Sequence, residues 1–399
     1  MTPPPIKVLM VTGAYHPEIS SGGLQSQLIA KTMTGMAEVR VLTTAIATGN
    51  PRHETIDGIE VTRIHVRMSS TASKLRAAVV MLRELAALMR WCDVVHVHGV
   101  SIKNVIVAAM ARRMGRPYLL SLHTSGADEP DAIRRTGALA WWAFRSASRY
   151  LAVSPALMNA AVESGIPANR IESVPNGIDT DRFRPATLEE RRQLRTSLAI
   201  DVDRPVVLFV GFFSHDKQPR VLFDAWLRMR DVHQADTSLV FVGAAKSDYH
   251  EVDESLVDAM RAEAARRGLG DRVTFTGAVH NVHDYFTLAD VFVLPSRREG
   301  LPVALMEAMS SGLPSVASRL PGATDTLIED GVSGRLVPPG DVEAFSEAVY
   351  LVLAEPATAA RMGAAARAVI TRDFSAATIA ARWIDNYRKA LGRSGVDRP

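Results

Sequence analysis

Cysteine is almost missing from this sequence, which has one, Cys92, among 399 residues. A disulfide within the chain and a zinc site built from several thiolates are therefore both excluded. A single free thiol suits a reducing compartment. The segment from Pro3 to Pro5 leads directly into an apolar stretch and has none of the charged and small-residue flanks of a signal peptide. We therefore expect a cytoplasmic protein.

Long hydrophobic runs and an excess of one charge are missing as well. A transmembrane helix needs about 20 apolar residues, and the segment 75–91 is interrupted by Arg83, Glu84 and Arg90. The 46 basic and 43 acidic residues leave a net charge of +3, far from the dense basic surface of a nucleic-acid-binding protein. We expect no nucleic-acid partner, and any membrane contact should be peripheral.

What is present is the composition of a folded globular protein, with 47% hydrophobic and 22% charged residues. The length suits two domains of roughly 150 to 200 residues each. In each half, short β-branched runs alternate with longer helical patterns, which predicts parallel strands joined by crossover helices. The predicted strands are 8–11, 39–43, 94–97, 118–122 and 150–153 in the first half, and 206–210, 238–242, 272–275, 291–294 and 314–317 in the second.

These patterns predict an α/β fold of two Rossmann-like, doubly wound parallel-sheet domains facing each other across a cleft. We place the N-terminal domain at 1–185 and the C-terminal domain at 200–374, with a polar linker at 189–195. A last helical pattern at about 375–392 could pack back on the N-terminal domain. The carboxyl ends of the two sheets would then meet one ligand in the cleft.

The most informative segment runs from Pro295 to Glu307, where a predicted strand ends, a glycine turn follows and a helix begins. Backbone amides at such a helix start can bind diphosphate oxygens. Glu299 lies in the turn and Glu307 two turns into the helix, so both carboxylates can accept hydrogen bonds from sugar hydroxyls. In the alternative interpretation, Glu299 caps the helix and Glu307 is a surface charge.

The pair Glu299 and Glu307, separated by seven residues, resembles the retaining GT-B glycosyltransferases of family GT4. The likeness spans nearly the whole chain, from the glycines near Gly22 onward. Other matching segments are Pro175 to Asp179, Gly312 to Pro314, Asp330 to Gly334 and Pro338 to Asp341. The resemblance implies the GT-B fold, retention of configuration at the transferred sugar, and a donor that is a UDP- or GDP-linked sugar.

The same resemblance assigns roles around the glutamate pair. It implies that Glu299 contacts hydroxyls of the donor sugar and that Glu307 holds the nucleotide ribose. Three residues of the turn between them would also line the donor, namely Gly300, Leu301 and Pro302.

A second donor contact is expected after the first strand of the C-terminal half. There Gly211 and Lys217 match family positions, and the resemblance implies that Lys217 neutralises the leaving diphosphate. The arginine that the family carries after the glycine is Phe212 here, and the residues that could replace it are His215, Arg220 and Arg297. In the alternative, Lys217 is a solvated loop lysine. Val279 would lie near the nucleotide base.

In the N-terminal half, Gly22 and Gly23 match the family's glycine loop, whose backbone approaches the diphosphate because glycine has no side chain. A plain turn is the alternative. The spacing is not the G-x-G-x-x-G of a dinucleotide-binding site, which argues against a dehydrogenase. His123 ends the strand 118–122 and opens the polar loop 124–128, where the family places a histidine near the reacting carbon of the sugar.

Metal binding is not expected. His96 and His98 alternate on one face of a strand end, but no cysteine or nearby acid completes a site. Two Asp-x-Asp patterns, beginning at Asp179 and Asp201, fall in loops and should be solvated turns. Lys217 and helix-start amides would replace a cation, so the sequence predicts neither a metal nor another cofactor.

Two segments could touch lipid or a hydrophobic acceptor. Leu139, Trp141, Trp142 and Phe144 with nearby arginines form an amphipathic pattern, and 74–90 forms another. Packing within the N-terminal domain is the alternative for both.

The sequence therefore predicts a glycosyltransferase that moves a hexose-type sugar from a nucleotide-diphosphate sugar to a glycan, glycolipid or small-molecule acceptor without a metal. His123, Lys217 and Glu299 would act at the reacting centre. A nucleotide-sugar epimerase and a non-catalytic nucleotide-sugar-binding protein remain alternatives on the same fold. The motifs leave open the base, the sugar, the acceptor, the linkage, the oligomeric state and what replaces the family arginine at Phe212.

Overall fold

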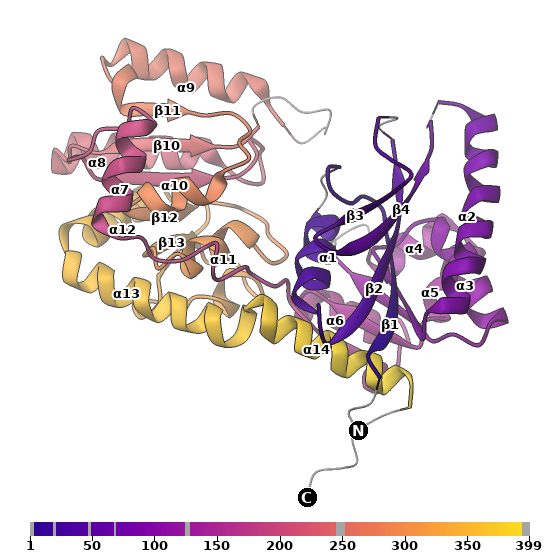
Figure 1. Cartoon of the computed structure of the whole chain (residues 1–399). Helices are drawn as coiled ribbons and strands as arrows, with labels where there is room; N and C mark the ends of the chain where they lie inside the picture. Colours follow the sequence, from indigo (N-terminus) through magenta and orange to yellow (C-terminus); the bar gives the residue numbers. More distant parts are fainter. Residues whose placement is uncertain are drawn as a thin grey trace, which may run out of the picture. The chain divides into compact units, whose positions relative to one another are not determined.

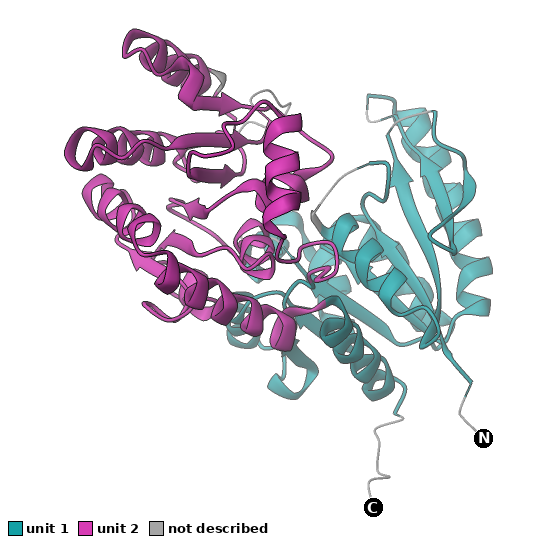
Figure 2. Cartoon of the chain, turned by 60° about the vertical axis from the view of Figure 1, so that its left-hand side comes forward, with its two compact units in different colours: residues 1–177, 376–399 teal, residues 178–375 magenta. Residues whose placement is uncertain are grey.

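The computed structural model describes residues 4–18, 21–46, 49–67, 69–123, 128–244 and 252–392. The chain forms two compact units (Figures 1 and 2). Unit 1 comprises Met1–Gly177 and Ala376–Pro399, and unit 2 comprises Ile178–Ser375. Most of the polar loop expected after His123, residues 124–127, lies outside the described residues.

In its described residues, the sheet of unit 1 has eight strands in the order β3-β4-β2-β1-β5-β6-β7-β8. Only β3 pairs antiparallel among the described strands, with β4. The strands are β1 (Ile6–Thr12), β2 (Ala37–Ala45), β3 (His53–Ile56), β4 (Ile59–His65), β5 (Val94–His98), β6 (Tyr118–Leu122), β7 (Arg149–Ala152) and β8 (Ile171–Ser173). The helices of the first segment are α1 (Ser21–Thr32), α2 (Thr71–Trp91), α3 (Lys103–Arg113), α4 (Pro130–Thr136), α5 (Ala138–Arg145), α6 (Pro155–Glu163) and the short η1 (Ala168–Arg170).

Helices cover both faces of this sheet, which explains the unbroken apolar strands. Along β1, Leu9 and Val11 pack in one buried cluster while Val8 and Met10 pack in another, as the two-residue period of a strand requires. The first cluster includes residues of α2, α3 and α5, and the second includes residues of α1 and the last helix, α14 (Ala376–Ala390).

The end of the chain returns to unit 1. Helix α14 buries Ile379, Trp383 and Tyr387 in the same cluster as β1 and α1. Residues 376–392 carry the colour of unit 1 in Figure 2. Unit 1 is therefore assembled from two segments far apart in the sequence.

Across the part of unit 2 that the structure describes, the sheet has six strands, all parallel, in the order β11-β10-β9-β12-β13-β14. The strands are β9 (Val206–Val210), β10 (Ser238–Val242), β11 (Val273–Phe275), β12 (Val291–Leu294), β13 (Ser315–Ser318) and β14 (Arg335–Val337). The helices are α7 (Leu188–Ser197), α8 (Pro219–His233), α9 (Glu254–Arg266), α10 (Val282–Leu288), α11 (Val303–Ser310), α12 (Val342–Ala354) and α13 (Pro356–Val369), with the short 3-10 helices η2 (Gly270–Arg272) and η3 (Thr324–Thr326) and the π-helix η4 (Ile370–Phe374). The α/β fold class with two parallel sheets is as predicted.

The polar segment predicted as a linker forms helix α7 instead. Thr187 and Glu190 build a capping box at its start. Near its end, the buried Arg195 donates to the Leu288 carbonyl and to the Asp290 carboxylate at 2.6 to 2.9 Å. The charged residues are one face of a packed helix, and the units divide at Gly177 rather than near 185.

Candidate functional site

Two loops of unit 2 meet at the carboxyl edge of its sheet, since β9 and β12 are parallel neighbours. Lys217 follows β9, and its Nζ donates to both carboxylate oxygens of Glu299 at 2.7 and 2.8 Å. Ser296 Oγ donates to Glu299 Oε1 at 2.6 Å. The Glu299 side chain is only 6% exposed and that of Lys217 28%. Lys217 and Glu299, the two residues that the sequence predicts to contact the donor, thus form one ion pair although they are 82 positions apart. The glutamate is buried and the lysine is partly exposed.

Asp216 ties the same two loops together a second time. Its carbonyl accepts from the backbone N–H of Arg297 at 2.7 Å, and its carboxylate accepts from the Arg298 guanidinium at 2.7 Å. The position of Glu299 is therefore fixed from both sides, which is what a site that orients a ligand requires.

Gly211 begins the loop after β9 and lies against the next loop, after β10. Its N–H donates to the Val242 carbonyl at 2.9 Å. A Cβ atom on Gly243 would lie 1.9 Å from the Gly211 carbonyl oxygen, so only glycine fits there. Gly243 was not among the predicted site residues. The repeated Val-Gly at the ends of β9 and β10 was the available signal.

Glu307 is the fifth residue of α11, so it lies about one turn into the helix rather than two. Its carboxyl group is largely buried, and burial raises its pKa to about 8, opposed by the charge of Arg182. Among the described residues, no group hydrogen-bonds this carboxyl. At neutral pH it is therefore protonated and can both donate and accept a hydrogen bond.

The turn between the glutamates leads into α11 without a side-chain cap. The N-cap residue is Pro302, and no acidic residue lies in the first turn. Because the Glu299 carboxylate holds Lys217, the interpretation of Glu299 as a helix cap is wrong. Gly300 and Leu301 are partly buried between Glu299 and this helix start. Val279 is partly buried against the unit 2 core.

Phe212 occupies the position of the family arginine and is 47% exposed. Among the residues that could replace the family arginine, Arg220 already forms ion pairs with Asp224 and Glu263, at N···O distances of 2.7 and 2.9 Å. His215 is exposed. Arg297 also has an exposed side chain and lies two residues from Glu299.

In unit 1, Gly22 and His123 line one pocket of about 250 Å³, together with His98, Lys103 and Asp128. We call it the histidine pocket. A Cβ atom on Gly22 would lie 3.6 Å from the His123 ring, so the two predicted residues do meet. Gly22 and Gly23 belong to the first turn of α1, however, rather than to a loop.

Asp128 organises the histidine pocket, and sequence reasoning missed it. One carboxylate oxygen accepts a hydrogen bond from the backbone N–H of His123 at 2.7 Å, and the other accepts one from the backbone N–H of Val100 at 2.8 Å. The loops after β5 and β6 are thereby joined. Lys103 was missed as well; its Nζ donates to Thr44 Oγ1 at 3.1 Å, and burial lowers its pKa.

Three histidines of unit 1, His96, His98 and His123, form a buried, neutral chain. His98 Nδ1 and His123 Nε2 lie 3.2 Å apart. His96 contacts the Tyr387 hydroxyl at 2.8 Å and Ser121 Oγ at 2.7 Å, so both its nitrogens are occupied. Burial lowers the pKa of His96 to about 3 and also lowers those of His98 and His123. His96 thus links β5 to α14.

No group of three potential metal ligands occurs within the described ranges. The Asp-x-Asp patterns are turns, as predicted. Asp179 Oδ1 accepts from the N–H groups of Asp181 and Arg182, and Asp201 Oδ1 accepts from those of Asp203 and Arg204.

The two amphipathic segments pack only in part. On α5, Trp141 and Phe144 stack at 5.3 Å between ring centroids, while Leu139 and Trp142 are exposed. On α2, an apolar row of three residues is exposed, made by Leu75, Val79 and Leu82. None of the helices in the described part of the chain is long and apolar enough to cross a membrane.

Comparison with solved structures defines the class of fold. HepE from Anabaena, solved in complex with UDP, superposes with a TM-score of 0.76 over 96% of this chain and all of that chain, at 20% identity. Such a match shows the fold alone, and it is the GT-B fold of two parallel-sheet α/β units.

Two family models match the sequence: the glycosyl transferase 4-like domain over residues 25–177 and the glycosyl transferases group 1 family over residues 190–369. The chain therefore belongs to the group 1 glycosyltransferases, with a glycosyl transferase 4-like domain in its N-terminal half.

Named relatives agree with this family. α-Maltose-1-phosphate synthase of Mycobacterium tuberculosis is 33% identical over 257 residues, which cover 61% of this chain and 64% of that protein. The chain therefore aligns with less than two thirds of that relative. The 2-deoxystreptamine N-acetyl-D-glucosaminyltransferase of Streptomyces fradiae is 27% identical and is matched over 98% of both chains.

Proposed function

We propose that this protein is a retaining glycosyltransferase that transfers a hexose-type sugar from a UDP- or GDP-linked donor to a glycan, glycolipid or small-molecule acceptor. The observation that carries the proposal is the Lys217–Glu299 pair beside the uncapped start of α11. It offers a cation, a carboxylate and helix-start amides at the carboxyl edge of one sheet, where α/β folds bind nucleotides.

The geometry suits a nucleotide-diphosphate sugar. A lysine ammonium has three N–H donors. Two of them bond Glu299, so the third is left for a diphosphate oxygen. Glu299 keeps acceptor capacity for a sugar hydroxyl, because a carboxylate offers about four lone-pair sites and Lys217 and Ser296 occupy three of them. Gly211, Gly300, Leu301 and Pro302 bring backbone close to the donor. Val279 contacts the base.

Glu307 suits the ribose. Its neutral, unpartnered carboxyl can donate to one ribose hydroxyl and accept from the other, which replaces the hydrogen bonds it lacks in the free protein. An ionised surface glutamate could only accept.

The reaction follows from these positions. The acceptor hydroxyl attacks the anomeric carbon on the face that the diphosphate leaves, the bond from that carbon to phosphate oxygen breaks, and the leaving phosphate takes the hydroxyl proton. Lys217 and the amides of α11 stabilise the departing charge in place of a metal, an effect worth roughly 3 to 4 kcal/mol for one well-placed donor. His123 supports the reacting face of the sugar, and Arg297 takes the place of the family arginine.

HepE was solved in complex with UDP and with UDP-glucose, and a UDP sugar is therefore the first to test here. By its name, the relative α-maltose-1-phosphate synthase makes a phosphorylated sugar. The reaction belongs in the cytoplasm, and the exposed face of α2 gives a route to peripheral contact with the inner face of the membrane.

The test is release of nucleoside diphosphate from a panel of UDP- and GDP-sugars, with a chelator present, first without and then with candidate acceptors. We expect selective release from one donor and loss of at least a hundredfold in Glu299→Ala. The control is Arg228→Ala, an exposed residue of α8 that pairs with Glu343. Tight donor binding without release would support a binding protein, and conversion to an epimer would support an epimerase; either would refute the transferase.

A further inference from the structure

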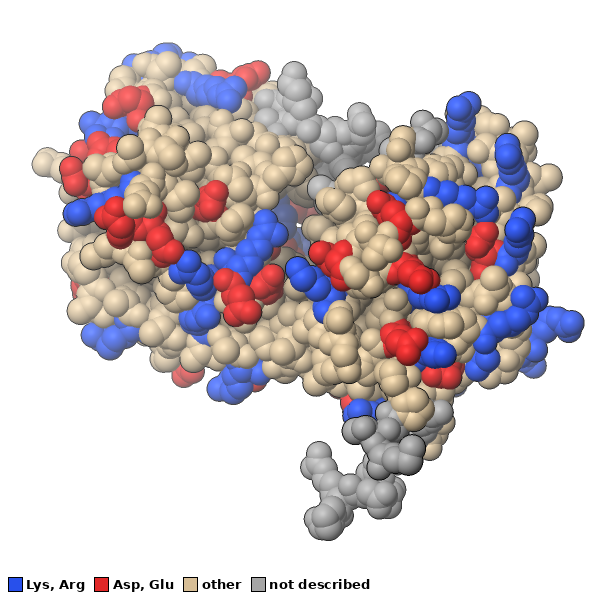
Figure 3. Space-filling model, viewed as in Figure 1, with Lys and Arg blue, Asp and Glu red and all other residues tan. Residues whose placement is uncertain are grey.

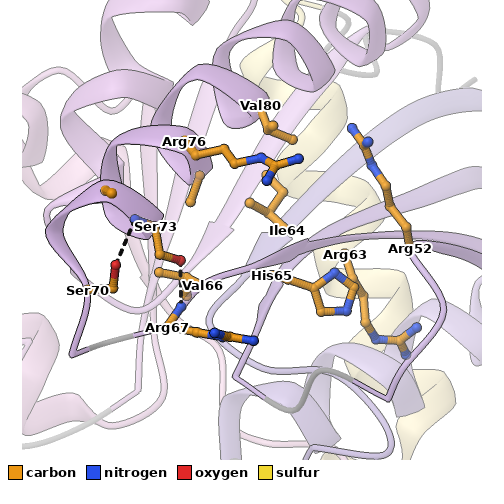
Figure 4. Close-up of a pocket in the computed structure, with 12 residues that line it drawn as sticks. Arg52, Arg63, Ile64, His65, Val66, Arg67, Ser70, Ser73, Arg76 and Val80 are labelled. Carbon is orange, nitrogen blue, oxygen red and sulfur yellow. Dashed lines mark hydrogen bonds between the residues drawn. The ribbon is translucent and has the colours of Figure 1, made fainter.

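Unit 1 has a second and larger cavity, of about 560 Å³, that the proposed reaction has not used. It lies where β4 ends and α2 begins. The charged residues of its lining are all arginines, namely Arg52, Arg63, Arg67 and Arg76. We call it the arginine pocket. Figure 4 shows guanidinium groups from three separate segments, at Arg52, Arg67 and Arg76, arranged around it.

Only part of this positive charge is neutralised. Arg63 donates to the Glu54 carboxylate and to the His16 carbonyl. Arg52 pairs with Glu84 at 2.7 Å. For the guanidinium groups of Arg67 and Arg76, the described residues provide no acidic or hydrogen-bonding partner. Within the described residues these two cations therefore have no counter-charge. Both side chains are exposed, so water screens their repulsion and leaves them available to an incoming anion.

The backbone adds to this positive charge. Arg63 also lines the cavity, but its buried guanidinium lies on the face of the sheet away from α2, because Arg63 shares the strand face of Val61 and not that of Ile64. The first turn of α2 forms part of the wall, and it contains no acidic residue. The positive end of a 21-residue helix thus adds to the arginines. A guanidinium group can donate two parallel N–H hydrogen bonds to two oxygens of one phosphate group.

The arginine pocket and the histidine pocket lie at the same edge of the sheet. In the order β4-β2-β1-β5, the arginine pocket is at the end of β4, and the histidine pocket is at the ends of β1 and β5. Two strand spacings from β4 to β1 amount to about 10 Å. Thr44, near the end of the intervening β2, already binds Lys103 of the histidine pocket. One molecule could therefore reach from one pocket to the other.

We propose that the arginine pocket binds a phosphate group carried by the acceptor, while the accepting hydroxyl lies at the histidine pocket. This deepens and rests on the proposed transferase function, since it names the class of acceptor. The phosphate belongs either to a phosphorylated small molecule or to the headgroup of a phospholipid. The lipid source has support in the exposed row Leu75, Val79 and Leu82 on α2 and in the basic side chains along the edge of Figure 3 where α2 lies in Figure 1.

The direct test is calorimetric titration with inorganic phosphate at constant ionic strength. We expect saturable binding to the wild type and at least tenfold weaker binding to Arg67→Gln and to Arg76→Gln. The matched control is Arg83→Gln, on the exposed side of the same helix and outside the cavity. Absence of saturable binding, or equal affinity in all four proteins, would overturn the proposal.

A vesicle assay identifies the source of the phosphate. With vesicles of phosphatidylglycerol and phosphatidylcholine, binding that inorganic phosphate competes away and that Arg76→Gln weakens more than Arg83→Gln indicates a lipid headgroup. No vesicle binding, together with the phosphate titration above, indicates a soluble acceptor. Equal losses in Arg76→Gln and Arg83→Gln would mean diffuse attraction by the helix and would count against the pocket.

Transfer assays separate this proposal from the proposed function. Inorganic phosphate should inhibit transfer competitively against the acceptor; binding of phosphate without such inhibition would refute an acceptor site. If no nucleotide sugar releases its nucleoside diphosphate, the transferase function fails, and the titration alone still decides whether the pocket binds an oxyanion.

Discussion

At the scale of single residues, the buried ion pair of unit 2 makes Lys217 important for stability and for turnover. Lys217→Ala should leave the Glu299 carboxylate, only 6% exposed, with Ser296 as its remaining partner. We expect a loss of about 1 to 3 kcal/mol in free energy of unfolding and of roughly a hundredfold or more in turnover. Urea unfolding and nucleoside diphosphate release measure the two effects. Unchanged turnover would remove Lys217 from the reacting centre.

Glu307 gives a prediction about pH. Its pKa is near 4.5 when unfolded and about 8 when folded, so the folded state binds the extra proton between these values. Stability therefore falls as pH rises from about 4.5 to 8, because a buried carboxyl must ionise. Glu307→Gln should be more stable than the wild type at pH 9 by about 1 to 3 kcal/mol, with the difference shrinking toward pH 5. Urea unfolding at several pH values tests this, and the exposed Glu343→Gln is the control. A difference independent of pH would contradict it.

At the scale of elements, the close approach of two strand ends predicts unequal effects of one substitution. Gly243→Ala would place a methyl group 1.9 Å from the Gly211 carbonyl oxygen at a φ of +153°. We expect it to cost more than about 3 kcal/mol. Gly277→Ala also has a positive φ, +73°, but meets nothing within 4 Å and should cost about 1 kcal/mol. Urea unfolding of both variants compares them, and equal costs would contradict the packing.

Burial decided which elements the sequence could predict. The central strands of both sheets are apolar on two faces and were found, whereas β3, β4, β8 and β14 were missed. Strand β3, with the sequence His-Glu-Thr-Ile, is an exposed edge strand and has no apolar run to detect. Helix α7 was missed because its charged outer face resembles a linker in composition.

The candidate site divides in the same way. Glu299, Lys217 and His123 lie in local motifs and could be picked out, but the contact that joins Lys217 to Glu299 spans 82 residues and leaves no periodic signal. Asp128 joins the nearby His123 to Val100, which is 28 residues away in sequence. Gly243 matters because its backbone lies against Gly211 of another loop. Such residues become visible only when the strand ends are brought together.

At the scale of the whole molecule, each unit has its own buried clusters and the last helix belongs to the first unit. Trp383 of α14 packs against His96 and His98, with ring centroids at 4.8 and 5.1 Å. Because units with separate cores can unfold separately, calorimetry should show two transitions. Trp383→Ala should destabilise unit 1 by about 3 to 5 kcal/mol and lower one transition only.

The same experiment assigns the transitions. UDP or GDP should raise the transition that Trp383→Ala leaves in place, because Lys217, Glu299 and Glu307 all lie in unit 2. Leu139→Ala, at a leucine of unit 1 that is 66% exposed, is the control and should move neither transition by more than a degree or two, about the effect expected of a surface substitution. If Trp383→Ala lowered both transitions equally, or if the nucleotide stabilised the transition of unit 1 instead, the assignment of α14 to unit 1 and of donor binding to unit 2 could not both be correct.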